Sequence, residues 1–133
     1  NKQVIDNTFE IICDCVGRLN GLNVLDIGGG PGHFSNEFAR RGSSVTWYDV
    51  SDTYKNIAIQ KAHNRNLNIN FKIGYIDEIP IEFNNKFDLV FNRVCWYYGV
   101  SDDQMFKAIT LPLKKGGYAY VETNNSNFRH LEL

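Results

Sequence analysis

The chain has 133 residues, of which 43% are hydrophobic and 22% charged, and its formal net charge is −1 at pH 7. These values are typical of one globular domain with a buried core, and they exclude the strong positive field that favours nucleic acid or an acidic membrane surface. We find no secretory leader and no apolar run of about 18 residues, so we expect a cytoplasmic protein without nucleic-acid or membrane partners.

The spacing of the three cysteines indicates reduced thiols rather than a disulfide framework. Cys13 and Cys15 lie within an expected helix, and Cys95 is distant from both in the sequence. Neither a second cysteine pair nor a histidine pair completes a zinc site. We therefore expect no metal.

Hydrophobic residues at helical spacing predict an amphipathic helix in the first part of the chain. They are Ile5, Phe9, Ile12, Val16 and Leu19. We expect a single domain over residues 1–133, in which this helix (1–21) precedes a core (22–122) and a tail (123–133).

Strands and helices alternate along the core. Segments rich in β-branched and aromatic residues predict strands at about 23–27, 44–49, 69–73, 87–91 and 118–122. Helices are predicted at about 32–41, 52–62 and 102–111, the second of them capped by Ser51 or Asp52. A turn at 114–117 precedes the last strand. The alternation predicts an α/β fold with a parallel sheet, in which a ligand binds at the carboxyl ends of the strands.

A glycine-rich turn joins the first strand of the core to the helix that follows it. Residues 26–32 are Asp-Ile-Gly-Gly-Gly-Pro-Gly, with glycines at every second position. Such a turn directs backbone N–H groups and the positive end of a helix dipole into one space, which favours a carboxylate or a phosphate. We therefore predict a nucleotide-like ligand. The dinucleotide pattern Gly-x-Gly-x-x-Gly would place its third glycine at His33, and this disfavours a dinucleotide.

An acidic residue, Asp49, ends the second strand, about twenty residues beyond the glycine-rich turn. A carboxylate at this place accepts hydrogen bonds from both ribose hydroxyls of an adenosine that lies across the strand ends. We expect Val50, next to it, to pack against the adenine. The same arrangement serves NAD and S-adenosylmethionine, so Asp49 supports an adenosine without deciding between these cofactors.

The spacing of the glycines, with Asp26 two residues before Gly28, resembles the first motif of class I S-adenosylmethionine-dependent methyltransferases. Residues 74–80 (Gly-Tyr-Ile-Asp-Glu-Ile-Pro), 87–90 (Phe-Asp-Leu-Val) and 113–117 (Leu-Lys-Lys-Gly-Gly) are similar to later motifs of that family, in the same order. The resemblance implies a three-layer, doubly wound Rossmann-like fold with helices on both faces of five parallel strands in the order 3-2-1-4-5. It also implies S-adenosyl-L-methionine as the cofactor.

The resemblance further implies a set of cofactor-binding residues: Asp26, Gly28, Gly29, Gly30, Gly32, Asp49, Val50, Ile76, Asp77 and Asn92. Tyr75 stands where the family usually has an acid that contacts adenine, so this contact is either lost or taken over by Asp77.

The activity implied is transfer of a methyl group to an acceptor, for which we expect a small molecule. Trp96, Tyr97 and Tyr98 are expected either to line the acceptor pocket or to be ordinary core aromatics. No residue can be assigned as a general base from the sequence.

The end of the sequence departs from the family pattern. The family's sheet continues past the fifth strand with a helix and an antiparallel pair of strands, whereas this sequence stops at Leu133, shortly after Glu122. We therefore expect no C-terminal antiparallel hairpin and an exposed edge at the fifth strand, which favours a homo-oligomer. Two alternatives stay open: a non-catalytic S-adenosylmethionine-binding module that acts with a partner, and a fragment of an NAD(P)-dependent oxidoreductase.

Overall fold

A six-stranded sheet with the order β3-β2-β1-β4-β5-β6 forms the centre of the computed structural model, which describes residues 1–93, 100–122 and 128–132. The strands are β1 (Asn23–Ile27), β2 (Ser44–Asp49), β3 (Ile69–Ile73), β4 (Phe87–Arg93), β5 (Leu113–Glu122) and β6 (Phe128–Glu132). The helices are α1 (Lys2–Val16), α2 (His33–Arg40), α3 (Asp52–Asn64) and α4 (Asp102–Thr110), with short 3-10 turns η1 (Ile76–Glu78) and η2 (Ile81–Phe83). Strands β1 to β5 pair in parallel, so the predicted order 3-2-1-4-5 is confirmed.

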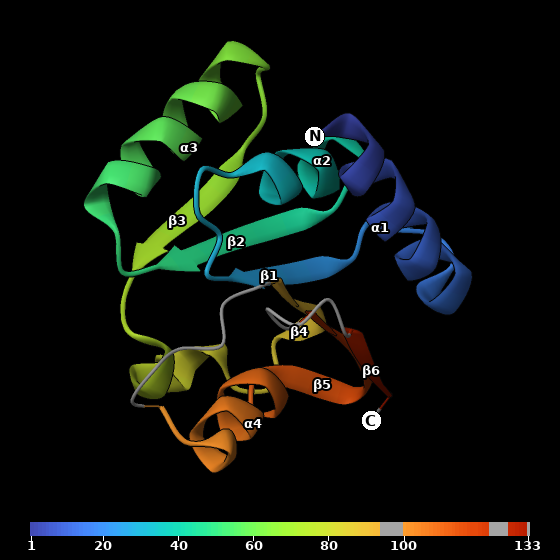
Figure 1. Cartoon of the computed structure of the whole chain (residues 1–133), viewed down its shortest axis with the longest axis vertical. Helices are drawn as coiled ribbons and strands as arrows, with labels where there is room; N and C mark the ends of the chain where they lie inside the picture. Colours follow the sequence, from blue (N-terminus) through green and yellow to red (C-terminus); the bar gives the residue numbers. More distant parts are fainter. Residues whose placement is uncertain (94–99, 123–127, 133) are drawn as a thin grey trace.

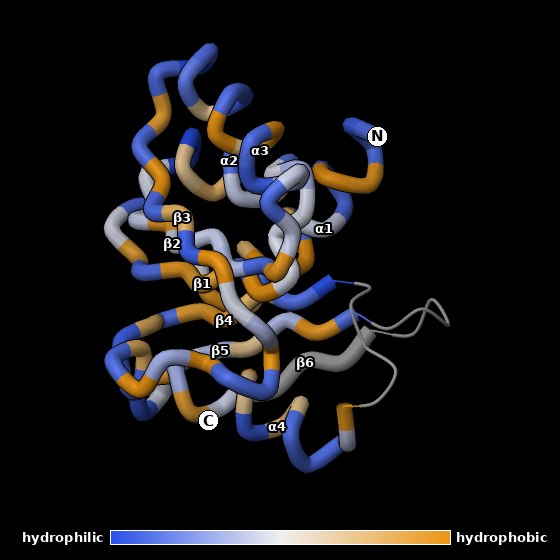
Figure 2. Tube along the Cα trace, turned by 90° about the vertical axis from the view of Figure 1, so that its left-hand side faces the viewer, coloured by the Kyte–Doolittle hydropathy of each residue, from blue (hydrophilic) through white to orange (hydrophobic). Residues whose placement is uncertain are grey.

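The helices cover both faces of the sheet and divide the core into two clusters. Figure 1 shows α1, α2 and α3 on one side of the sheet and α4 on the other. Phe9, Phe38 and Ala58 pack on the first face, whereas Met105 and Ile109 pack on the second with η1 and η2. Figure 2 shows the apolar residues concentrated along the central strands, between these layers. Burial of both sheet faces explains why the parallel strands are rich in apolar residues.

Side-chain caps define where the helices that connect the parallel strands begin. Ser51 Oγ accepts a hydrogen bond from the N–H of Tyr54 at 3.0 Å, so Ser51 and not Asp52 is the cap of α3. Ser101 and Gln104 form a reciprocal capping box at the start of α4. Helix α1 ends at Val16, and the following Leu19, predicted as part of the helix, is nevertheless buried in the same core cluster.

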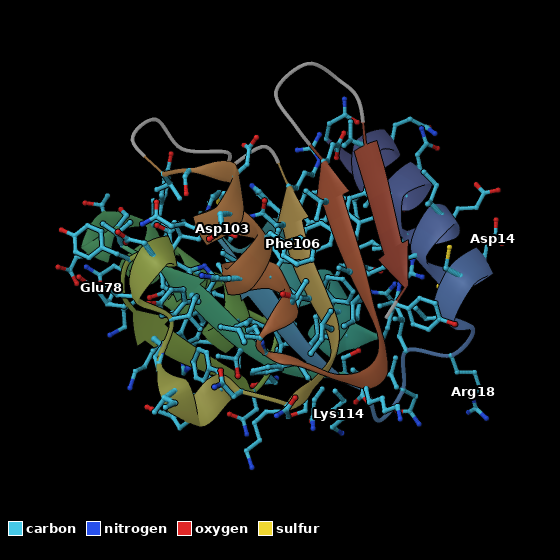
Figure 3. The ribbon with its side chains drawn as sticks, turned by 90° about the horizontal axis from the view of Figure 1, so that it is seen from below. Asp14, Arg18, Glu78, Asp103, Phe106 and Lys114 are labelled. Carbon is cyan, nitrogen blue, oxygen red and sulfur yellow. The ribbon has the colours of Figure 1, made fainter. Side chains whose placement is uncertain are left out.

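The predicted absence of a C-terminal antiparallel strand is wrong. The backbone of Phe128–Glu132 forms β6, which pairs antiparallel with β5 from Tyr118↔Glu132 to Glu122↔Phe128 (Figure 3). An antiparallel neighbour needs a short connection, whereas a parallel one needs a crossover of about a dozen residues, so the short tail suffices for one more strand. The prediction of an exposed β5 edge is therefore also wrong, and association of two copies through that edge loses its basis.

The predicted turn at 114–117 is instead an irregular start of a longer strand. β5 begins at Leu113, which pairs with Phe87, and the register then shifts before Leu89 pairs with Tyr118. Gly116 has φ 83°, a conformation that glycine adopts without strain. The glycines therefore form a bulge inside β5 rather than a connection in front of it.

The described part of the chain contains neither a candidate membrane span nor a candidate metal cluster. None of its helices has the length and apolar character that crossing a membrane requires. Within the same residues, no group of three or more His, Cys, Asp and Glu side chains is arranged to hold a metal ion. Cys13 and Cys15 lie half-buried on α1.

Candidate functional site

A shallow cleft lies at the carboxyl ends of the parallel strands, where the sequence places the site. The register sets Ile27 beside Tyr48 and beside Asn92, so the ends of β1, β2 and β4 lie next to one another. The residues that line the cleft come from the ends of β1 and β2 and from the segments that follow β1, β2 and β3, and they are Ile27, Gly28, Tyr48, Asp49, Val50, Gly74 and Ile76. Of the predicted site residues, Gly28, Asp49, Val50 and Ile76 are therefore brought together.

The glycine loop after β1 is held by hydrogen bonds within the chain. The N–H groups of Gly28 and Gly29 donate to the Tyr48 carbonyl at 2.7 and 3.2 Å, and the N–H of Gly32 donates to the Gly29 carbonyl at 3.1 Å. Gly28, Gly30 and Gly32 have φ values of 71°, 54° and 88°, which explains their spacing. The structure thus differs from the expectation that these N–H groups converge on a ligand, because they donate to carbonyl groups of the chain itself. These hydrogen bonds fix the conformation of the loop.

Asp49 is built into the cleft as a fixed acceptor. The residue is 8% exposed, Oδ2 accepts from the N–H of Gly30 at 2.9 Å, and Oδ1 accepts from the N–H of Ser51 at 3.1 Å. A carboxylate has about four lone-pair sites, so these two bonds leave capacity for ligand hydroxyls. Asp49 therefore couples the end of β2 to the glycine loop and presents negative charge to the cleft.

Asp26 lies beneath the loop and does not line the cleft. The residue is 2% exposed, and its carboxyl accepts a hydrogen bond of 2.6 Å from Ser35 Oγ on α2. The pKa of Asp26 is raised to about 7, chiefly by burial; the hydrogen bond from Ser35 lowers it and the charge of Asp49 adds to the rise. Asp26 connects β1 to α2, and a direct contact with a ligand stays a prediction.

The residues after β3 surround a second, neighbouring pocket. Ile76 is 6% exposed and lines both the cleft and this pocket, whereas Asp77 lines only the pocket, together with Asn84 and Lys107. Tyr75 is 60% exposed and lines neither. An adenine contact by Tyr75 or Asp77 therefore stays a prediction, while the placement of Ile76 agrees with the proposed site.

Asn92 ties the end of β4 to the end of β1. Its side chain is fully buried, and Nδ2 donates to the Ile27 carbonyl at 3.0 Å. This bond fixes the side chain as a brace between the two strands, which leaves the backbone carbonyl as the group expected to contact a ligand. Trp96, Tyr97 and Tyr98, which follow in the sequence, lie outside the described residues.

Comparison with known proteins decides the family. The family model described as a methyltransferase domain matches residues 24–117, a range that contains the glycine loop, Asp49 and Ile76. The chain belongs to the methyltransferase domain family. The resemblance in the sequence motifs is thereby confirmed.

The methyltransferase domain has relatives among curated proteins and solved structures. The ubiquinone biosynthesis O-methyltransferase of Coxiella burnetii is 32% identical over 111 residues, which are 84% of this chain and 47% of that protein. A protein of Methanococcus maripaludis, assigned as an S-adenosyl-L-methionine-dependent methyltransferase, has a TM-score of 0.77 and 30% identity over 89% of this chain and 54% of its own. An N-methyltransferase of Haemonchus contortus, in complex with phosphomonomethylethanolamine and S-adenosylhomocysteine, has a TM-score of 0.77 and 26% identity over 87% of this chain and 27% of its own. The chain spans about half the length of the curated relatives that it matches.

Sequence reasoning missed two aromatic residues that hold the loops around the cleft in place. Trp47 Nε1 donates to the Gly30 carbonyl at 2.9 Å, and the Tyr48 hydroxyl donates to the Tyr75 carbonyl at 2.7 Å. The sequence predicts both residues only as parts of a strand. Their position directly before Asp49 indicates a contact with the neighbouring loops, because side chains at the end of a parallel strand lie next to the loops of its neighbours.

Proposed function

We propose that this methyltransferase domain binds S-adenosyl-L-methionine and forms the cofactor-binding part of an enzyme that methylates a small molecule. The observation that carries the proposal is the convergence of the glycine loop, Asp49 and Ile76 on one cleft in a chain of this family. Further support comes from the relatives, because curated ones include ubiquinone biosynthesis O-methyltransferases and one structural neighbour is a complex with S-adenosylhomocysteine.

The chemistry of the cleft fits the adenosine part of the cofactor. Val50 and Ile76 supply apolar surface for the adenine, and the fixed carboxylate of Asp49 accepts from ribose hydroxyls. The residues assigned to the amino-acid end lie in the loop after β1 and near the end of β4, and they are Gly28, Gly29, Gly30, Gly32 and Asn92.

The chain contributes binding and orientation to the proposed reaction. The cofactor, when bound, supplies a methyl group on a positively charged sulfur, which a nucleophile on the acceptor can attack. Asp49 adds negative charge at the cleft, and this favours a cationic ligand over a neutral one. The glycine loop, whose N–H groups are already bonded, holds its shape before the ligand arrives and so lowers the entropy cost of alignment.

Ligand-dependent unfolding tests the proposed cofactor. S-adenosyl-L-methionine and S-adenosylhomocysteine should each raise the melting temperature of the chain, because a ligand that binds the folded state alone stabilises it by about 2.7 kcal/mol at a hundredfold excess over Kd. NAD and NADH should leave the melting temperature unchanged. Stabilisation by NADH without an effect of S-adenosylhomocysteine would instead support the oxidoreductase alternative.

A methyl-transfer assay on the full-length protein separates an enzyme from a binding module. We expect transfer of labelled methyl groups to a small aromatic or amine acceptor from a panel. Cofactor binding without transfer to any acceptor would favour the non-catalytic alternative.

A further inference from the structure

We propose that Trp47 and Tyr48, adjacent residues on opposite faces of β2, are positioning residues that set the geometry of the two loops around the adenosine. This inference rests on the proposed function and deepens it. The first of these loops is the glycine loop after β1, and the second is the segment Gly74–Glu78 after β3, which contains η1. Because β2 lies between β1 and β3 in the sheet, residues at its end can contact both loops at once.

Trp47 supports the glycine loop from the side of α2 and α3. The indole is fully buried, its Nε1–H donates to the Gly30 carbonyl at 2.9 Å, and its ring packs against Phe71 with 5.6 Å between the ring centres. A Cβ atom on Gly29 would overlap the indole ring. The loop therefore lies directly on the indole, and its height above the sheet is set by this ring.

Tyr48 supports the second loop from the opposite face of the sheet. Its ring is 1% exposed and packs edge-on against Phe83, with 5.8 Å between the ring centres. Its hydroxyl donates to the Tyr75 carbonyl at 2.7 Å and lies 3.3 Å from the Glu78 carbonyl, so one side-chain oxygen contacts both ends of η1. A Cβ atom on Gly74 would overlap this hydroxyl, which explains the glycine at that position.

Tyr48 connects the glycine loop to the segment Gly74–Glu78 through its backbone and its side chain. Its carbonyl accepts from the N–H groups of Gly28 and Gly29, while its side chain holds η1. Burial, with added repulsion from Glu78 and Asp77, raises the pKa of the Tyr48 hydroxyl to about 12, so this group keeps its proton and stays a donor at neutral pH. Successive side chains of a strand point to opposite faces, and this is how two neighbours can serve two loops.

Conservative variants separate positioning from general stability. Tyr48→Phe removes the hydroxyl and keeps the ring, and Trp47→Phe keeps an aromatic ring and removes the N–H. Each should weaken binding of S-adenosylhomocysteine and of adenosine by about fivefold to tenfold, the effect of one lost hydrogen bond on ligand geometry. Tyr120→Phe is the matched control, because Tyr120 is also buried and its hydroxyl bonds Glu122, away from both loops.

Amide hydrogen exchange adds a readout that a purely structural role would not move. Tyr48→Phe should speed exchange at Glu78, whose N–H bonds the Tyr75 carbonyl, and Trp47→Phe should speed exchange at Gly30, whose N–H bonds Asp49. Tyr120→Phe should change neither amide nor the affinity. If the wild-type chain binds S-adenosylhomocysteine and both variants bind it equally well while folded, the positioning role is refuted. If the wild-type chain does not bind it, the proposed function fails instead.

Discussion

Replacement of Asp26 by Asn should stabilise the domain by about 4 kcal/mol at pH 8 and hardly at all at pH 4. Burial raises the pKa of this carboxyl to about 7 from its ordinary value of 3.8. Because the folded chain holds this proton more tightly than the unfolded chain, the wild type loses stability as the pH rises from about 4 to about 7 and carries the full cost above that range. Asn cannot ionise, and its oxygen can still accept from Ser35 Oγ.

Urea unfolding from pH 4 to pH 8 measures this difference. The curves of wild type and Asp26→Asn should meet near pH 4 and separate with rising pH. Asp14→Asn is the control, since Asp14 is exposed on α1 (Figure 3) and its replacement should leave the wild-type pH dependence in place. A gap between wild type and Asp26→Asn that stays constant with pH would contradict the raised pKa.

Replacement of Gly29 by Ala should lower both the stability of the domain and its affinity for S-adenosylhomocysteine. The new Cβ would overlap the Trp47 indole, so either the ring or the loop must move. We expect a loss of stability of about 1–3 kcal/mol from overpacking and a loss of affinity for S-adenosylhomocysteine of about tenfold or more. Urea unfolding and calorimetric titration measure the two effects.

A double-mutant cycle with Trp47→Phe checks the cause of the Gly29 effect. The smaller ring lacks Nε1, one of the indole atoms that the new Cβ would overlap, and leaves space into which the ring can shift. Gly29→Ala should therefore cost less stability in the Trp47→Phe background than in the wild type. Equal costs in the two backgrounds would show that the overlap with the indole is not the reason.

Local sequence patterns were sufficient to predict the parallel part of the fold. The observed bounds of β1, β2 and β3 agree with the predicted strands, because runs of β-branched and aromatic residues between turn residues mark strands. The last strand, β6, was missed because the expectation rested on how many residues the usual family extension needs. Backbone pairing needs far fewer, and local patterns do not show which edge of a sheet is available.

The sequence predicted the site residues that lie at or directly after the ends of strands. It did not predict the contacts that side chains of one strand make with loops that follow other strands. Asp49 follows from its position at the end of β2 and Ile76 from its position after β3, and both line the cleft. The orientation of Asp26 follows from alternation, since Val24 of the same strand faces the first core cluster and Asp26 points to the same side. The supports from Trp47 and Tyr48 required the fold, because their partners belong to loops that follow two other strands.

Calorimetric titration of S-adenosylhomocysteine into the wild type and Asp49→Asn tests most directly whether the cleft binds this cofactor. Asn keeps the shape of Asp49 and one acceptor for the Gly30 N–H, and it removes the negative charge and one acceptor for the ribose. Hydrogen bonds to charged groups contribute about 1.5–3 kcal/mol, so the affinity should fall by at least about tenfold. Asp52→Asn, in the exposed first turn of α3, should bind like the wild type. Absence of binding to the wild type, or equal affinities of the wild type and Asp49→Asn, would contradict the assignment.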